Sequence, residues 1–320
     1  RWLAPGLSTN LSLSEWTISN TWALLPGMTI TVTNTLRITG TNTYLSRLEL
    51  SNASSIACGR LELDRAQLVV GHKQVLHALN IYDPVLPDPG GSTLACAGDL
   101  VLTNEARMTV FAGLACPGLA SDYGAGISAG GDLWLGSNCW IYPLAHPTNG
   151  ASVLFSMRNL TVTNAGGFQA DGAGYWGSYG TSGQGPGAPG ASCHGAGYGG
   201  TGSWGYLAWS EPGRPYGVSN APTAPGSSAG GRVSYSTTNY GPYGGGSVQI
   251  RASDTVAFSG LITANGGPGA PQNGGGSSGG GIYITCNTFI GDSNGVLRAN
   301  GGAGNQSSSN GGGGGSGGRI

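Results

Sequence analysis

Paired carboxylates are the first chemistry to look for in this chain. Glycoside hydrolysis needs two carboxyl groups roughly 5–9.5 Å apart across a cleft. Four aspartates stand where such a pair could form: Asp83, Asp88, Asp122 and Asp171. Asp83 and Asp88 bound a loop fixed by prolines, and Asp122 precedes a Tyr-Gly turn. Only 14 residues are acidic, and Asp99 and Asp132 recur in front of strands, where they cap or solvate the strand start. We therefore expect no enzyme and no catalytic residue.

Basic and sulfur-bearing side chains predict no site either. The only lysine available as a base for β-elimination is Lys73. The four histidines show no spacing typical of a metal-ligand pair: His72, His77, His146 and His194. The six cysteines contain no Cys-x-x-Cys spacing of a zinc or iron–sulfur site: Cys58, Cys96, Cys116, Cys139, Cys193 and Cys286. The sequence thus predicts no metal and no cofactor. The cysteines fit either disulfides in an oxidising compartment or buried free thiols, and spacing cannot reveal their pairing.

Comparison of similar segments along the chain favours a turn position for Asp171 over a catalytic acid. Ala170-Asp171-Gly172 occupies the same position as Ala264-Asn265-Gly266 and Ala299-Asn300-Gly301. A position that alternates between Asp and Asn before Gly is typical of a turn, because short polar side chains tolerate positive φ and bond nearby backbone. We interpret Asp171, Asn265 and Asn300 as repeat turn positions. If the copies stack in register, Asn265 and Asn300 could form an amide ladder.

These turns belong to an internal repeat of about 35 residues, the kind of period that marks stacked architectures. Gly244–Gly269 and Gly279–Gly304 match almost position for position, with an alternating strand, a polar turn and a second apolar strand. Earlier strands open in the same way, as in Gly59-Arg-Leu-Glu-Leu63 and Gly98-Asp-Leu-Val-Leu102. Period-2 alternation over short runs predicts strands. We expect an all-β protein with almost no helix, folded as a right-handed parallel β-helix (β-solenoid) with long glycine-rich loops.

The expected β-helix divides into three parts. Residues 1–165 and 247–320 would form its coils, the second set carrying glycine-rich arms and an incomplete last coil. Residues 166–246 form an insertion rich in Gly, Tyr, Trp and Pro that packs on the solenoid. Two interpretations of this insertion remain open: side-by-side polyproline-II segments, or a long Ω-like excursion. Its aromatic side chains either contact a glycan or partner subunit or bury themselves: Tyr175, Trp176, Tyr179, Tyr198, Trp204, Tyr206, Trp209 and Tyr216.

Composition narrows the classes of partner. Only 8% of the residues are charged and the net charge is −1, against about 25% charged in an average protein. Such a chain has no electrostatic footprint for nucleic acid, and it has no apolar run long enough for a membrane span. Low charge with 63 glycines favours a secreted, extracellular or cell-surface protein. The chain begins at Arg1 without a signal peptide, so we expect either a removed signal or a trimmed piece.

The repeated Ala-Asn-Gly-Gly segments, followed by the run Gly312–Ile320, resemble the glycine-rich β-helix surface proteins of bacteria, which are adhesin- or autotransporter-like repeat proteins. The resemblance covers Asn159–Ile320 well and Trp16–Tyr142 only through its strand openers. It implies an extracellular, structural or adhesive role and carries no active site.

Two functions follow as hypotheses from the repeats and the composition. The first is a structural subunit of an extracellular filament, sheath or surface appendage, a homopolymer that assembles head to tail through open ends of the fold. Arg319 and Ile320 would then form the strand that joins subunits, because they open a strand that the sequence does not continue. The second is a surface protein that binds or degrades a polysaccharide.

Overall fold

The fold is known from a computed structural model of the chain. The structure describes the following residues: 2–3, 10–41, 43, 45–51, 54–71, 75–76, 81–82, 91–116, 118–120, 122–177, 182–207, 210–231, 240–306 and 311–320. Within these ranges there is no helix, in agreement with the all-β expectation.

Most strands belong to two parallel sheets. The nine-stranded sheet contains, in spatial order, β1 (Trp2–Leu3), β4 (Trp22–Pro26), β6 (Ser46–Ser51), β8 (Ala66–Val70), β13 (Arg107–Phe111), β16 (Trp140–Leu144), β19 (Gly167–Gln169), β22 (Leu261–Thr263) and β25 (Val296–Arg298). The main path of the fourteen-stranded sheet contains β23 (Gly281–Thr285), β20 (Ser247–Ala252), β17 (Ser152–Met157), β14 (Tyr123–Ala129), β11 (Thr93–Cys96), β7 (Ser55–Asp64), β12 (Leu100–Thr103), β15 (Leu133–Leu135), β18 (Leu160–Val162), β21 (Thr255–Phe258) and β24 (Thr288–Gly291). Off this path, β2 (Asn10–Leu13) and β3 (Trp16–Ser19) both pair with β5 (Thr29–Thr39), which pairs with β7. A separate antiparallel pair joins β9 (Val75–Leu76) to β10 (Ile81–Tyr82).

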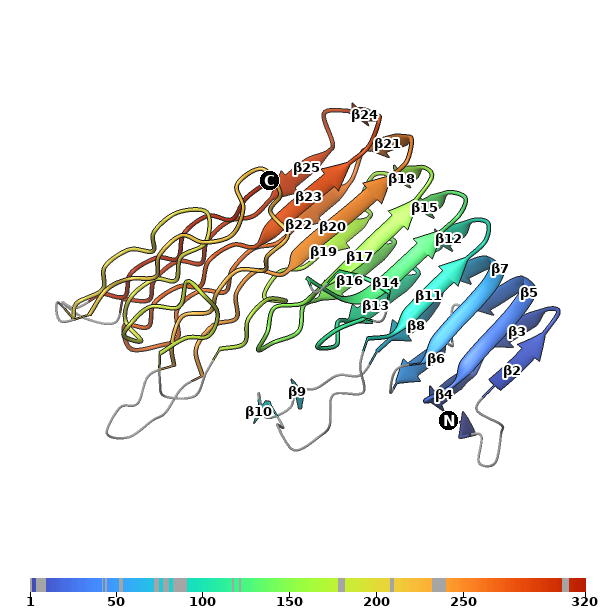
Figure 1. Ribbon diagram of the computed structural model, residues 1–320, viewed down its shortest axis with the longest axis horizontal. Helices are drawn as coiled ribbons and strands as arrows, with labels where there is room; N and C mark the ends of the chain where they lie inside the picture. Colours follow the sequence, from blue (N-terminus) through green and yellow to red (C-terminus); the bar gives the residue numbers. More distant parts are fainter. Residues whose placement is uncertain are drawn as a thin grey trace.

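The prediction of a single right-handed parallel β-helix is wrong. The described strands form two parallel sheets that run side by side as layers, and the chain alternates between them (Figure 1). The strand openers predict parallel strands that recur in register. They carry no information on how these strands divide between sheets, because period-2 alternation only says that one face of each strand is buried.

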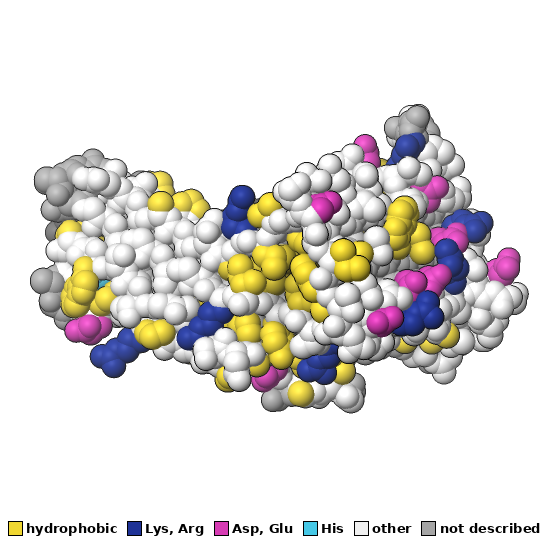
Figure 2. Space-filling view, turned by 90° about the horizontal axis from the view of Figure 1, so that it is seen from above, with side chains coloured by type: hydrophobic (Ala, Val, Ile, Leu, Met, Phe, Trp, Pro, Cys, Tyr) yellow, Lys and Arg dark blue, Asp and Glu magenta, His cyan; other side chains and the backbone are white. Residues whose placement is uncertain are grey.

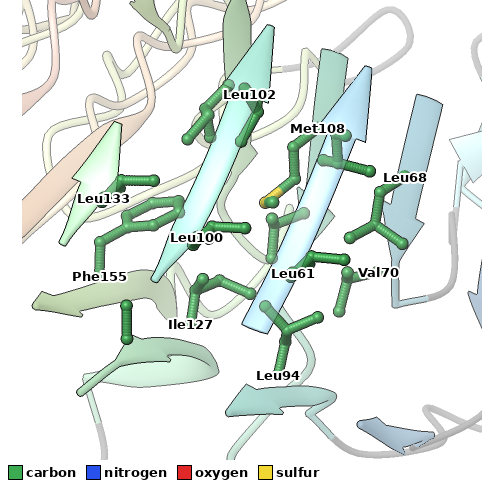
Figure 3. Close-up of a cluster of buried hydrophobic side chains, with 14 of the residues drawn as sticks. Leu61, Leu68, Val70, Leu94, Leu100, Leu102, Met108, Ile127, Leu133 and Phe155 are labelled. Carbon is green, nitrogen blue, oxygen red and sulfur yellow. The ribbon is translucent and has the colours of Figure 1, made fainter. Parts of the chain in front are cut away.

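Apolar columns hold the two sheets together. Strands pair in parallel register, so side chains at equivalent positions stack above one another. One column of the fourteen-stranded sheet runs through Ile30, Ile56, Leu94, Ile127, Phe155 and Ile250. The facing column of the nine-stranded sheet runs through Leu48, Leu68, Met108, Ile141, Phe168 and Ile262. All of these side chains are buried, and the labelled members of Figure 3 lie in one cluster between the sheets. Each burial stabilises the fold by about 1.5–3 kcal/mol.

The glycine-rich half is built in another way. Its segments lie side by side beyond the ends of the strands, at the left of Figure 1. Gly276 and Gly279, three residues apart, both donate backbone hydrogen bonds to the segment 313–316, at 2.9 and 3.0 Å. The N–H of Ser277 points to another neighbour, the carbonyl of Gly267. Donors that return to the same neighbour every third residue match the three residues per turn of polyproline II, which makes no internal hydrogen bonds.

Glycine is required at every third position of these segments because the backbones touch. A Cβ on Gly312, Gly315 or Gly318 would lie 2.0–2.1 Å from a carbonyl oxygen of the segment 274–280. The segments that interleave come from the insertion and from both later arms: 170–177, 192–199, 224–230, 241–246, 264–269, 275–281, 299–304 and 312–319. The described segments of residues 166–246 are therefore continuous in packing with the described arms of residues 247–320.

Candidate functional site at the open end of the sheets

Two of the four aspartates considered as acids, Asp122 and Asp171, lie among the described residues. Asp83 and Asp88 lie outside the described residues. Asp122 lines a surface depression of about 310 Å³ together with Asn149 and Tyr175. The carboxylate of Asp171 accepts a hydrogen bond from the backbone N–H of Asn265 at 2.7 Å.

The three turn positions form a ladder between repeats. The side-chain oxygen of Asn265 accepts from the N–H of Asn300 at 2.8 Å, as Asp171 does from Asn265. None of the three has a positive φ. The side chains of Asp171 and Asn265 thus bond the next copy of the repeat instead of their own turn, and Asn300 is the last residue of this ladder.

A second row of carboxylates is held by arginines. Asp99 accepts from Arg60 at 2.6 Å and from the backbone N–H of Asp132 at 3.0 Å. Glu62 is paired with Arg37 at 2.6 Å and with Arg60 at 2.9 Å. Partial burial alone would raise the pKa of Glu62, but the hydrogen bonds and charges of the two guanidinium groups outweigh burial and hold the pKa below its ordinary value. Charged side chains accordingly gather at the right of Figure 2, while the glycine-rich left half shows few.

The described histidines and cysteines are dispersed through the fold. No cluster of three or more His, Cys, Asp or Glu side chains able to hold a metal exists among the residues that the structure describes. His72, His77 and Lys73 lie outside them. His146 and His194 are buried, and Nδ1 of His194 accepts from the N–H of Gly205 at 2.8 Å. Burial lowers the pKa of His194, which favours the neutral ring.

Three of the six described aromatic side chains that the sequence singled out in the insertion pack inside it. Tyr175 and Tyr198 are buried. Tyr216 lies against Tyr198, with ring centroids 4.8 Å apart, and the guanidinium of Arg319 lies 5.2 Å from the Tyr198 ring. Burial raises the pKa of Tyr198 to about 12. The structure therefore brings Tyr198, Tyr216 and Arg319 together as packing groups.

The remaining insertion aromatics are more exposed or undescribed. Trp204 is 54% exposed and meets the ring of His194 edge-on. Trp176 and Tyr206 are half-buried. Tyr179 and Trp209 lie outside the described residues. Trp204 is thus the one described aromatic of this set with a largely free face.

The strands β23, β24 and β25 end the two sheets, and their apolar columns are open there. Ile250, Val256 and Ile262 are each fully buried. Their partners in the last repeat are Ile284, Phe289 and Leu297, and these are half-buried or exposed. They line a depression of about 440 Å³ with Ile282, Tyr283, Ser219, Asn220, Pro222 and Ile320. Positions that are buried in the preceding repeat are therefore accessible to solvent at this end of the sheets.

Arg319 and Ile320 lie at this same surface. The N–H of Arg319 donates to the carbonyl of Gly280 at 3.1 Å, and the N–H of Ile282 donates to the carbonyl of Arg319 at 2.9 Å. Arg319 therefore forms an isolated parallel bridge with Gly281 of β23. Ile320 is 63% exposed. The role of these two residues in joining subunits stays a prediction. The sequence analysis did not single out Ile284, Phe289 and Leu297, which comparison with the preceding repeat could have found.

A second surface, also missed from the sequence, covers the outer face of the nine-stranded sheet. Consecutive in-register neighbours place Trp22, Arg47, Gln67, Arg107 and Trp140 in one row. The Arg47 guanidinium lies 5.2 Å from the Trp22 ring and pairs with Glu49 at 3.1 Å. A shallow depression of about 430 Å³ lies along this face, lined by Arg47, Gln67, Val69, Arg107, Thr109, Phe111, Tyr142 and Leu144. The alternation of inward and outward side chains within each strand could have revealed this face in the sequence.

Comparison of the chain with protein-family models, with curated proteins and with solved structures gave no match. Among the residues that the structure describes, none forms a helix of the length and apolarity needed to cross a membrane.

Proposed function

We propose that this protein is a structural subunit of an extracellular filament, sheath or surface appendage and that copies join end to end through the open end of the sheets. The observation that carries the proposal is the change in burial along three apolar columns. Positions that are fully buried at Ile250, Val256 and Ile262 become solvent-accessible at Ile284, Phe289 and Leu297. Open apolar strand edges associate with further strands unless they are covered.

The occupant to which we commit is a second copy of the chain. In each copy, strands β2 and β3 lie at the other end of the fourteen-stranded sheet. Their side chains Leu11, Leu13 and Trp16 continue its inward columns and are half-buried. Strands there pair in parallel with β5, so a head-to-tail contact would continue the register without reversing direction. Such a contact is heterologous and propagates into a filament. Low charge and the resemblance to bacterial glycine-rich surface proteins support the extracellular placement.

Sedimentation velocity over a range of protein concentrations, with electron microscopy of the same samples, tests this proposal. We expect concentration-dependent growth into rods, abolished by Ile284→Asp combined with Leu297→Asp. The matched control is Ile290→Asp, because Ile290 is 55% exposed on β24 but does not line the depression. A wild-type chain that stays monomeric at every concentration would overturn the proposal.

Polysaccharide binding is the second candidate, and the outer row of the nine-stranded sheet favours it. Trp22 and Trp140 stand at the two ends of the row that also holds Arg47, Gln67 and Arg107. Aromatic faces stack on apolar ligand surfaces, and a few polar groups fix orientation. Affinity electrophoresis against neutral and acidic polysaccharides tests this role. We expect retardation that Trp22→Ala and Arg107→Ala reduce, whereas Trp134→Ala on the other sheet leaves it unchanged. Release of reducing sugars would point to degradation instead.

A further inference from the structure

Cys58 and Cys96 face each other inside the molecule. Cys58 lies in β7, Cys96 ends β11, and the two are direct partners in the parallel register of these strands. They stand in one inward column between Val32 and Ala129. Their exposed fractions are 5% and 3%. The pair is thus enclosed by the core of the fourteen-stranded sheet.

The two sulfur atoms are unusually close. The Sγ atoms lie 3.1 Å apart, nearer than a van der Waals contact between two sulfurs. A disulfide has an S–S length of about 2.05 Å and spans Cα atoms about 4.4–6.8 Å apart. Neighbouring strands of a sheet lie about 4.8 Å apart, within that range. Only a small rotation of the side chains therefore separates this contact from a bond.

The backbone draws the two strands together at this point. The N–H of Ala97 donates to the carbonyl of Cys58 at 2.7 Å, and the N–H of Gly98 donates to the carbonyl of Gly59 at 2.6 Å. Both are shorter than the usual 2.9–3.0 Å. A Cβ at Gly98 would lie 2.9 Å from the Gly59 oxygen, so a glycine close to Cys96 permits the approach. The close packing of backbone brings the two Cβ atoms toward disulfide distance.

We propose that Cys58 and Cys96 form an intrachain disulfide that ties β7 to β11. In the reaction the two thiols lose two protons and two electrons, and a small-molecule disulfide such as oxidised glutathione takes them up to give two thiols. One S–S bond forms and one is broken. This inference is independent of end-to-end assembly, since it concerns the interior of the sheet.

The bond forms before the sheet closes. In the folded chain the side chains of Cys58 and Cys96 are almost fully enclosed by the core of the sheet. Thiol–disulfide exchange requires access of the oxidant to the sulfur atom. An oxidant therefore reaches the pair during folding, and the experiment must fold the chain in the presence of the oxidant.

Thiol counting after refolding tests the proposal. The chain is refolded with oxidised and reduced glutathione, denatured without reductant, alkylated and weighed. We expect four of the six cysteines to be alkylated. Trypsin then separates residues 48–60, which contain only Cys58, from residues 74–107, which contain only Cys96, unless a disulfide joins them. We expect the joined peptide, and its conversion to the two single peptides on reduction.

Matched variants show whether the bond acts on stability. Reduction should lower the Tm of the wild type by roughly 5 °C. Cys58→Ala and Cys96→Ala should lose this response, and Cys139→Ala should keep it, because Cys139 is buried in another part of the core. Six alkylated cysteines in the refolded wild type, or a joined peptide with different cysteines, would overturn the proposal even if no variant folds.

Discussion

The strand half and the glycine-rich half of this protein are built from the same repeats but are held together by different atoms. In the strand half, stacked side chains such as Phe155 and Phe168 fill the space between two sheets. In the glycine-rich half, backbone carbonyls lie where side chains would stand, and hydrogen bonds join segments every third residue. Deletion of side-chain atoms should therefore harm the first half, whereas addition of a single carbon should harm the second.

The largest effect is expected in the strand half. Phe155 is fully buried and meets Phe168 edge-on with centroids 5.2 Å apart. Phe155→Ala should lower the free energy of unfolding by about 3–5 kcal/mol, because it removes buried apolar surface and leaves a cavity. Denaturant titration gives the value. Phe289→Ala, at a position 47% exposed, should cost less than half as much, and equal losses would mean that the open end is covered.

The second-largest loss of stability is expected when one methyl group is added to the glycine-rich half. A Cβ on Gly315 would lie 2.0 Å from the carbonyl oxygen of Ser277, so the segments must separate. Gly315→Ala should lower the free energy of unfolding by about 3 kcal/mol, near the upper end for overpacking. Gly317→Ala is the matched control, since its nearest neighbour is an oxygen 3.9 Å away. Hydrogen exchange should localise the loss to residues 264–281 and 312–319; a uniform loss over both halves would contradict separate packing.

High pH should also distinguish the halves. Burial raises the pKa of Tyr198 to about 12, compared with about 10 in an unfolded chain. The neutral phenol therefore contributes stability that is complete below about pH 10 and is lost as the pH rises through 12, a change of about 2–3 kcal/mol. We expect the glycine-rich half to open first in alkaline hydrogen-exchange experiments.

Tyr198→Phe provides the check on that assignment. Because phenylalanine cannot ionise, the variant should lose less stability between pH 10 and 12 than the wild type. Tyr142→Phe, on the half-exposed outer face of β16, should behave as the wild type does. An unchanged alkaline profile in Tyr198→Phe would assign the effect to another group, first of all to Tyr216, whose pKa burial also raises.

How far the sequence predicts this structure depends on which atoms decide each feature. Alternation and the strand openers located part of the strands, among them β7, β12, β20 and β23, and repeat comparison identified Asp171, Asn265 and Asn300 as equivalent positions. It could not show that their side chains bond the next repeat, because that depends on the distance between stacked copies. The division of the strands between two sheets was also missed, because alternation only shows that one face of each strand is buried. Exposure of Ile284 and Leu297 depends on position within the stack, which no local pattern encodes.

The smallest expected effect concerns the charged row, which the glycine-rich half lacks. Glu62 is held by Arg37 and Arg60, and its lowered pKa adds stability that is present above the unfolded pKa of about 4.3 and disappears as the pH falls through the folded value. Both arginines are about half exposed, so solvent screens the pairs and Glu62→Gln should cost only about 0.5–1 kcal/mol at pH 7. The difference between variant and wild type should vanish at pH 2 and shrink in 1 M salt, where screening acts within about 3 Å. A loss that persists under both conditions would mean that Glu62 acts through packing rather than charge.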